Sequence, residues 1–506
     1  SSDLLEHLPG ITPESVLEAL KEELVPLDNP LIRFEGRTPP EGGAEALREA
    51  WNEGAASEIA AGEAGELAEW GYTDFGPAGE VVSDTVEPLL GIRTIRFANG
   101  LRLNLKKTDV QRDRISIQLN VDGGHLVNTL EDPLATQMAS ALEVGGLGKH
   151  TRDEIQSILA GRTVGFNFAA GGETFVAVAN TTSRDLELQL QMIAAGISDP
   201  GFRPQGEAQY RRSIENLFAQ LTATPQNALA NALGGIISDN DPRYTLQPKD
   251  AYLALSFAEL RNDIGDRLDN GALELALVGD FDEQQAIDFV ARTLGALPPR
   301  EAEFRPYHEN RNRTFTADRA PRTVFHDGAP DQAIVRMDWP TTDDRDFTEV
   351  LKLEVLERVM RLQLLDKVRE ELGQTYTPSS NASQSAVYPG FGYFTIAAPI
   401  DAAQVEAARE AMLETVQGLI AAPVDEDTLL RARRPMVESY ENALKTNAGW
   451  MNLVDRAQSE PHRLERFTSA IRILGEISPE DVRATAEKYL NPEERLEIVV
   501  LPRPAD

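Results

Sequence analysis

Apolar and polar residues alternate along several short stretches of the chain, as they do in strands with one buried face. Residues 95–105 contain two such runs on either side of Asn99 and Gly100, a pair typical of tight β-hairpin turns. A third run, over residues 115–121, stops at Gly123. The pattern therefore predicts a hairpin followed by a third strand at the start of a domain.

After this hairpin the spacing of apolar residues changes between helical and strand-like. We predict helices over 133–143, 151–160, 184–196 and 283–294, further helices within 205–260, and strands over 175–179 and 273–281. The same order starts again after a polar linker at about 300–320, with strands over 333–339 and 391–398 and helices over 346–372, 402–421 and 425–446. The repeat predicts an α+β fold of two homologous domains, each a mostly antiparallel sheet with helices packed on one face.

The chain closes with a capped helix and a buried-type strand, and a similar pair stands near its start. Ser478 and Pro479 begin the closing helix, and Thr12 and Pro13 begin the early one, which a strand-like stretch at 30–34 follows. The pair looks like one closing unit used twice. We therefore expect residues 1–36 to be the C-terminal tail of an upstream domain, 37–92 an acidic linker, 93–300 a first full domain and 321–506 a second.

Composition and charge narrow the class of protein. The 506 residues are enough for two to four domains, and no run of 18 or more apolar residues could cross a bilayer. The net charge of −33 argues against nucleic acid or anionic lipid as a partner, because like charges repel. Residues 1–90 hold 20 acidic and only 4 basic residues, which favours a solvated linker over an acidic docking surface.

The ends and the cysteine content say little about the compartment. The chain starts at Ser1 without an initiator Met or a basic region, so we expect a fragment or a processed form. The absence of cysteine excludes disulfides, thiolate metal sites and cysteine nucleophiles. An exported protein and a cytoplasmic one look the same by this measure.

Residues 368–376 read Val-Arg-Glu-Glu-Leu-Gly-Gln-Thr-Tyr and carry the most distinctive candidate chemistry in the chain. Arg369 and Tyr376 are both hydrogen-bond donors, which suit a peptide carbonyl or a tetrahedral oxyanion. Their spacing alone fits equally a helix residue that pairs with Asp366 or Glu370, and a tyrosine at the edge of a core. No H-x-x-E-H motif accompanies them anywhere in the sequence.

This organisation resembles the C-terminal half of a pitrilysin/insulinase-type zinc metallopeptidase, the inverzincin family. The resemblance rests on five stretches that follow the order of the family: 97–102, 278–281, 294–298, 368–376 and 477–501. Such enzymes consist of two halves of two homologous domains each, with zinc in the first domain. The resemblance implies that the last domain presents Arg369 and Tyr376 to the substrate.

The zinc motif itself is degenerate in this chain. In the family, H-x-x-E-H places two imidazoles one helical turn apart for zinc, with the glutamate as general base. The equivalent stretch, 136–140, reads Thr-Gln-Met-Ala-Ser and offers neither a ligand nor a base. Glu215 stands near the third-ligand position, and we expect it to face solvent or to pair with another helix. His462 and Glu465 form a near miss with Arg466 in place of the second histidine, which we interpret as a surface helix.

Other candidate features have ordinary explanations. The remaining histidines have no partner four residues away, and we expect surface or turn positions for them: His7, His125, His150, His308 and His326. The glycine-rich stretch 165–172 resembles a loop of non-catalytic processing-peptidase subunits, and a turn that needs positive φ explains it equally well.

The resemblance implies the non-catalytic C-terminal half of a zinc metallopeptidase, with an inactive domain at 93–300 and the Arg/Tyr motif in the domain at 321–506. We expect it to close a chamber over a zinc-bearing N-terminal half or partner chain, and to bind peptides or unfolded polypeptides for proteolysis. The segment alone is expected to hold no metal and to be inactive as a hydrolase, with zinc in the N-terminal half. The alternative is a structural or binding subunit of the same fold with no peptidase role. A periplasmic location fits bacterial members of the family, and the sequence leaves compartment, oligomeric state and substrate open.

Overall fold

The computed structural model describes residues 10–23, 30–36, 38–57, 68–372 and 377–504, the side chains of 368–372 excepted. The chain divides into two compact units, Ser1–Glu66 and Leu67–Asp506. No helix in the described residues is both long and apolar enough to span a bilayer.

The smaller unit contains helices α2 (Pro13–Glu23) and α3 (Gly43–Ala56). Thr12 and Ser15 exchange hydrogen bonds between backbone and side chain at the start of α2, so the predicted helix start is confirmed. The predicted strand at 30–34 is wrong, because residues 30–36 have no regular structure. A strand is stable only with a hydrogen-bonded neighbour, and no described residue pairs with this segment.

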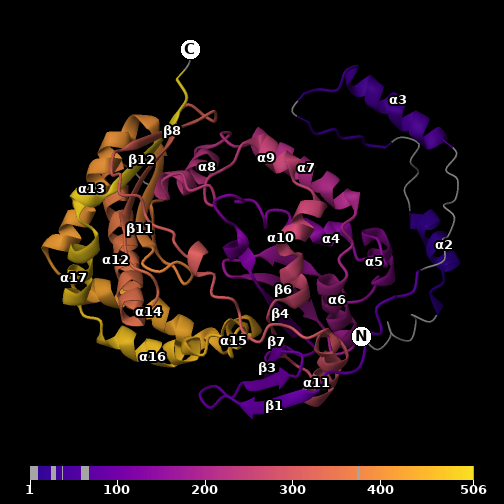
Figure 1. The fold of residues 1–506 in the computed structure, drawn as a ribbon. Helices are drawn as coiled ribbons and strands as arrows, with labels where there is room; N and C mark the ends of the chain where they lie inside the picture. The colour runs from indigo at the N-terminus through magenta and orange to yellow at the C-terminus, as the bar shows by residue number, and fades with distance from the viewer. Residues whose placement is uncertain (1–9, 24–29, 37, 58–67, 373–376, 505–506) are drawn as a thin grey trace. The chain divides into compact units, whose positions relative to one another are not determined.

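The larger unit contains two sheets, and the first has seven strands in the order β1-β2-β3-β7-β4-β6-β5 (Figure 1). Their bounds are β1 Val81–Val86, β2 Arg93–Phe97, β3 Arg102–Lys107, β4 Ile115–Asp122, β5 Asn167–Ala170, β6 Thr174–Thr181 and β7 Leu273–Gly279. The hairpin around Asn99 and Gly100 is confirmed: β2 pairs with β3, and Gly100 has a φ of +95°. Only the β3–β7 pair is parallel, so the sheet is mostly antiparallel.

The second sheet repeats the strand order of the first. Its order is β10-β11-β9-β12-β8, which corresponds to β5-β6-β4-β7-β3. The bounds are β8 Arg322–His326, β9 Gln332–Pro340, β10 Ser379–Gln384, β11 Gly392–Asp401 and β12 Leu496–Pro502. The β12–β8 pair is parallel, as β7–β3 is, and the other pairs are antiparallel. The predicted fold class, α+β with two homologous sheets, is confirmed.

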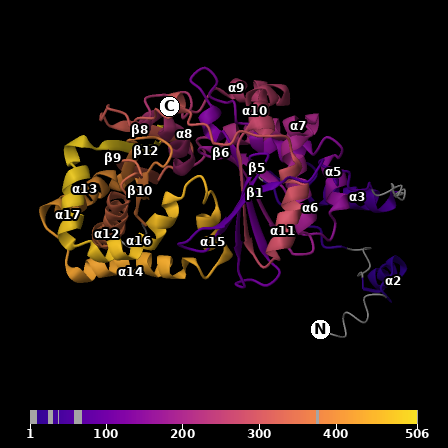
Figure 2. The ribbon, with the colours of Figure 1, turned by 60° about the horizontal axis from the view of Figure 1, so that its bottom comes forward.

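Except for one helix in each half, the helices cover one face of the sheet that belongs to their own half (Figures 1 and 2). The first set comprises α4 Leu142–Gly145, α5 Arg152–Ile158, α6 Leu186–Ser198, α7 Pro204–Ala219, α8 Pro225–Ile237, α9 Lys249–Ala254, α10 Phe257–Asn270 and α11 Glu283–Arg292. The second comprises α12 Phe347–Leu372, α13 Val405–Ala421, α14 Glu426–Ala443, α15 Asn447–Val454, α16 His462–Glu476 and α17 Pro479–Tyr489. Apolar side chains of α6, α10 and α11 form one core with the first sheet, and those of α12, α13 and α17 form another with the second.

Helices α8 and α15 are exchanged between the two halves. Helix α8 packs on the face of the second sheet that is opposite α12, α13 and α17. Its residues Ala228, Leu229 and Ile237 contact Ile498 and Val500 there. In return, α15 packs on the face of the first sheet that is opposite α6, α10 and α11. Its residues Met451, Leu453 and Val454 share a buried cluster with Ile92, Ala276 and Val278. Each half therefore completes the core of the other.

The capped start of each exchanged helix is visible in the sequence. Thr224 precedes Pro225 of α8 and accepts a hydrogen bond from Asn227 N, while Thr446 accepts one from Gly449 N at the start of α15. Side-chain caps of this kind satisfy backbone N–H groups that have no partner within the helix.

The stretch 37–92 has more regular structure than its composition predicts. Strand β1 and helix α3 both lie within residues 37–92, where we expected a linker. Shortly before β1 in the chain, the Tyr72 hydroxyl donates to Asp199 Oδ2 over 2.7 Å and accepts from Lys149 N. Residues 70–86 therefore pack on the first sheet and its helices, while the domain boundaries themselves stay a prediction.

Candidate functional site

The stretch equivalent to the family's zinc helix does not form a helix here. Residues 133–138 are a turn, a 3₁₀ turn covers Ala139–Ala141, and α4 begins only at Leu142. The prediction of a helix over 133–143 is therefore wrong for most of its length. The reason is local: Asn128 Oδ1 accepts from both Thr136 N and Thr136 Oγ1, which holds the turn against the loop before it.

A chain of hydrogen bonds runs through the stretch that the resemblance equates with the zinc motif. Because Thr136 Oγ1 donates to Asn128, it is left to accept from His125 Nδ1 at 3.1 Å. That assignment puts the proton of the imidazole on Nδ1 and leaves Nε2 as an acceptor. Desolvation lowers the pKa of His125, although the residue as a whole is exposed. The imidazole already has Thr136 as a partner.

These residues do not fit zinc. One imidazole, a threonine and an amide give neither three strong ligands nor a general base. Among the residues that the structure describes, no group of three or more histidine, aspartate or glutamate side chains is arranged to hold a metal ion. Glu215, near the family's third-ligand position, is exposed and pairs with Lys249 of α9 over 2.8 Å, in agreement with a helix-pair role.

A cavity of about 500 Å³ lies beside this hydrogen-bonded chain. His125, Thr136 and Gln137 form one wall, and Tyr244, Arg313 and Tyr388 are among the residues that form the rest. The tyrosine rings of this wall contact each other edge to face, with centroids 5.6 Å apart. The sequence analysis missed Arg313 and Tyr388, because nothing in the local pattern indicates that they meet the degenerate zinc stretch.

A second cavity, of about 1350 Å³, is lined by both halves of the larger unit. Its lining includes Glu173 of the β5–β6 turn, Arg456 and Arg463, and Arg456 lies 3.7 Å from Glu173. The charged groups on this wall are largely paired: Glu173 accepts from Arg311 over 2.6 Å, and Arg463 lies 3.7 Å from Asp455. Burial raises the pKa of Asp455 above its ordinary value, and Arg463 opposes this shift.

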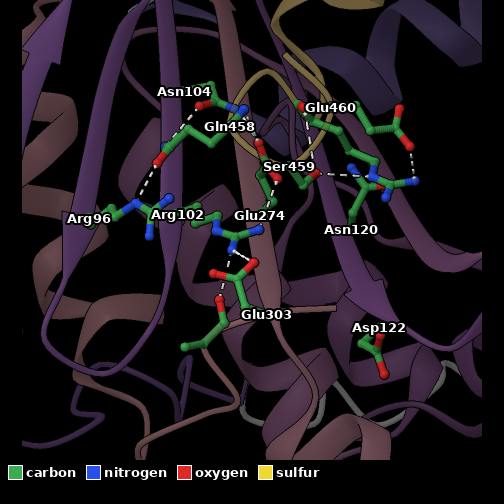
Figure 3. Close-up of polar contacts among 12 residues, drawn as sticks. Arg96, Arg102, Asn104, Asn120, Asp122, Glu274, Glu303, Gln458, Ser459 and Glu460 are labelled. Atoms are coloured by element: carbon green, nitrogen blue, oxygen red, sulfur yellow. Dashed lines mark hydrogen bonds and ion pairs between the residues drawn. The ribbon is translucent and has the colours of Figure 1, made fainter. Parts of the chain in front are cut away.

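Buried polar residues join the two halves next to the larger cavity (Figure 3). The fully buried Glu274 of β7 accepts from Asn104 Nδ2 over 2.7 Å and from Gln458 N over 2.8 Å. Asn104 also donates to the carbonyl of Val454, the last residue of α15. Glu274 Oε2 has no hydrogen-bond partner, and Arg102 Nη1 lies 3.9 Å from it. These bonds fix the loop after α15 on the first sheet.

The two residues predicted to bind substrate fall outside the described side chains. Arg369 belongs to the last turn of α12, and Tyr376 lies in the stretch 373–376, so the structure does not test their contacts. Strand β10 begins three residues after Tyr376, and among the described residues it pairs with β11 alone. The predicted motif therefore connects a helix to an edge strand.

Four of the other positions differ from what the sequence suggested. His150 and His326 are buried rather than at the surface, and each is hydrogen-bonded to the backbone. Gly171 and Gly172 do not have positive φ. Close packing explains Gly172 instead, because a Cβ there would lie 2.9 Å from a methyl group of Val387. His462, in contrast, is exposed at the start of α16, as expected for a surface helix.

Comparisons with known proteins agree with this structure. Residues 254–436 match the family model of the peptidase M16 inactive domain. A curated relative, the chloroplastic stromal processing peptidase of Arabidopsis thaliana, is 20% identical over an alignment that covers 73% of this chain and 33% of the relative. The chain therefore spans about a third of the length of that relative.

Two of the solved structures with the same fold are proteases of about twice this length. The periplasmic protease PqqL from Escherichia coli aligns with a TM-score of 0.70 and 17% identity, over 91% of this chain and 51% of its own. The ferredoxin protease FusC, solved in complex with Arabidopsis ferredoxin, aligns with a TM-score of 0.72 and 13% identity, over 99% and 55%.

The fold is therefore that of the pitrilysin/insulinase-type proteases. Within that class, the chain carries an M16 inactive domain and corresponds to the C-terminal half, so the resemblance found in the sequence is confirmed. The catalytic half of this family is the zinc-dependent one.

Proposed function

We propose that this chain is the non-catalytic half of a zinc metallopeptidase, which closes a chamber over a zinc-bearing half and binds the peptide substrate. The observation that carries the proposal is the Asn128–Thr136–His125 chain: the fold is kept, and the stretch that we equate with the zinc motif holds groups that satisfy each other. Such a domain has no means of activating water. It can still supply walls that exclude bulk water and select substrates by size.

Arg369 and Tyr376 are proposed to hold the substrate near the scissile bond. Their place between the end of α12 and edge strand β10 supports this assignment. An extended peptide can add to an edge strand through backbone hydrogen bonds, and β10 follows both residues closely in the chain. Their donor groups suit a carbonyl or the oxyanion that forms from it.

The test uses the active assembly of this chain with its zinc-bearing half. Replacing Arg369→Ala is expected to lower kcat/KM for a peptide roughly a hundredfold, and Tyr376→Phe roughly tenfold or more, because each removes a donor to developing negative charge. Zinc content should not change, since neither residue is a ligand.

Arg434→Ala is the control. Arg434 is exposed on α14 and pairs with Glu438 one helical turn away, and its removal is expected to leave turnover unchanged. Full activity in both Arg369→Ala and Tyr376→Phe would contradict the proposed substrate role and favour the structural or binding subunit.

A further inference from the structure

Arg313 has an environment that its role in the fold does not explain. It lies in the polar connection between the two halves and lines the 500 Å³ cavity. Its guanidinium carbon is 4.0 Å from the ring centroid of Tyr244 and 4.4 Å from that of Phe391, and its Nε donates to Ser238 Oγ over 3.1 Å. The two aromatic contacts and the hydrogen bond fix the plane of the guanidinium.

The terminal nitrogens of Arg313 have no protein partner in the described part of the chain. They make no hydrogen bond there, no carboxylate lies within 4 Å, and neither nitrogen is sealed from solvent. Neighbouring Arg243 is different, because it forms an ion pair with Asp241 at 2.5 Å. This pairing raises the pKa of Arg243, whereas burial lowers the pKa of Arg313. Arg313 is therefore an oriented, half-buried cation with no carboxylate in contact.

The walls of this cavity also lack negative charge. The protein has 82 acidic residues, yet none of those that the structure describes lines the cavity, where the polar groups are arginine, histidine, tyrosine, threonine and amides. The volume is within the range of small-ligand pockets, roughly 300 to 1,000 Å³. An acidic wall would have neutralised Arg313, so its absence leaves the cation available to a ligand.

We propose that this cavity binds a carboxylate group of a peptide, which Arg313 holds through its two terminal nitrogens. The planar guanidinium presents parallel N–H donors that match the two oxygens of a carboxylate. The carboxylate can be the C-terminus of the peptide or an aspartate or glutamate side chain.

The neighbouring cavity supports a peptide as the source of the carboxylate. Gly172 lines both the 500 Å³ and the 1350 Å³ cavities, so the two adjoin at this residue. A peptide in the larger cavity can reach Arg313 past Gly172, where a side chain would collide with Val387. The inference rests on the proposed peptide-binding function and adds a subsite to it.

The test measures binding to the full chain by calorimetry with three N-acetylated hexapeptides of otherwise uncharged sequence. One is a free acid, one its C-terminal amide, and one an amide with a single internal glutamate. The acid is expected to bind at least about tenfold more tightly than the plain amide, the gain of a charge-assisted hydrogen-bond pair. The glutamate-containing amide distinguishes the sources: tight binding indicates a side-chain carboxylate, and weak binding the C-terminus.

Variants assign the preference to this cavity. Arg313→Gln should abolish the preference, and Arg313→Lys should keep only part of it, because an ammonium lacks the paired donors. Gln137→Glu places a carboxylate on the exposed cavity wall and should weaken binding of the acid severalfold. Gln417→Glu makes the same change on the exposed face of α13 and should have no effect.

Equal binding of all three peptides, no binding of any peptide, or a preference for a carboxylate that survives Arg313→Gln would overturn the inference. Unfolding temperatures of the variants show whether Arg313→Gln has lost its fold, and Gln137→Glu keeps the test decisive in that case. Because this assay measures a preference for acid over amide and the Arg369 test measures turnover, the failure of one is distinct from the failure of the other.

Discussion

The exchange of α8 and α15 predicts that a small change in one half loosens the sheet of the other. Val454 is fully buried at the end of α15, where it packs with Ala276 and Val278 of β7. Val454→Ala removes two methyl groups at about 0.8 kcal/mol each and leaves a small cavity, so local stability should fall by about 1.5–3 kcal/mol. In hydrogen exchange this corresponds to roughly a ten- to hundredfold faster opening.

Hydrogen exchange followed by mass spectrometry measures the effect for each strand. Peptides that contain β3 and β7 should lose protection in Val454→Ala, although they lie more than 170 residues away in sequence. Val355→Ala is the matched control, because Val355 is equally buried but belongs to the core of the second sheet. It should affect α12 and β9 more than β3 and β7. Loss of protection confined to α15 in Val454→Ala would refute the exchanged-helix packing.

Three further predictions concern pH, metal and the docked segment. Desolvation and the nearby carboxylates Asp132 and Glu259 raise the pKa of Asp263 to about 6, so the folded state binds the proton more tightly than the unfolded state. Stability should therefore fall as pH rises from about 4 to about 6. Asp263→Asn should raise the unfolding temperature at pH 7.5 but not at pH 4. The same difference in unfolding temperature between variant and wild type at both pH values would contradict this. Restoring H-x-x-E-H through Thr136→His, Ala139→Glu and Ser140→His should not create a zinc site, because positions 136 and 140 do not lie on one helical turn. Calorimetry measures this, and stoichiometric zinc binding with micromolar affinity would show that reasoning to be wrong. Tyr72→Phe should destabilise the larger unit by about 1–2 kcal/mol in urea unfolding, since Asp199 Oδ2 and Lys149 N lose their common partner; no change would argue against a docked segment.

Local patterns predicted most of the elements, and tertiary packing explains the failures. The Asn99-Gly100 turn and the Thr and Ser helix caps act within a few residues, so the sequence shows them directly. Strand β1 escaped because Val81, Val82 and Val86 are exposed at a sheet edge and do not alternate. The exchange of α8 and α15 depends on where two distant helices dock, which no local pattern encodes.

For the candidate site, too, the sequence shows the local features and not those that depend on tertiary packing. The loss of H-x-x-E-H is plain in the sequence, and the Arg369 and Tyr376 motif is recognisable as a stretch of residues. The Asn128–Thr136–His125 chain and the stacked Arg313 are not, because each brings together residues from separate loops. An arginine in a polar linker becomes a candidate for binding a ligand only when the structure shows that no carboxylate contacts it.

The most direct test of the central claim is a peptide-hydrolysis assay. It compares this chain alone, its zinc-bearing half alone, and a mixture of the two. The account predicts no hydrolysis by this chain even with added zinc, and activity of the mixture that a chelator removes and that exceeds the sum of the separate halves at least tenfold. Chelator-sensitive hydrolysis by the isolated chain would contradict the account, as would a mixture no more active than the zinc-bearing half alone.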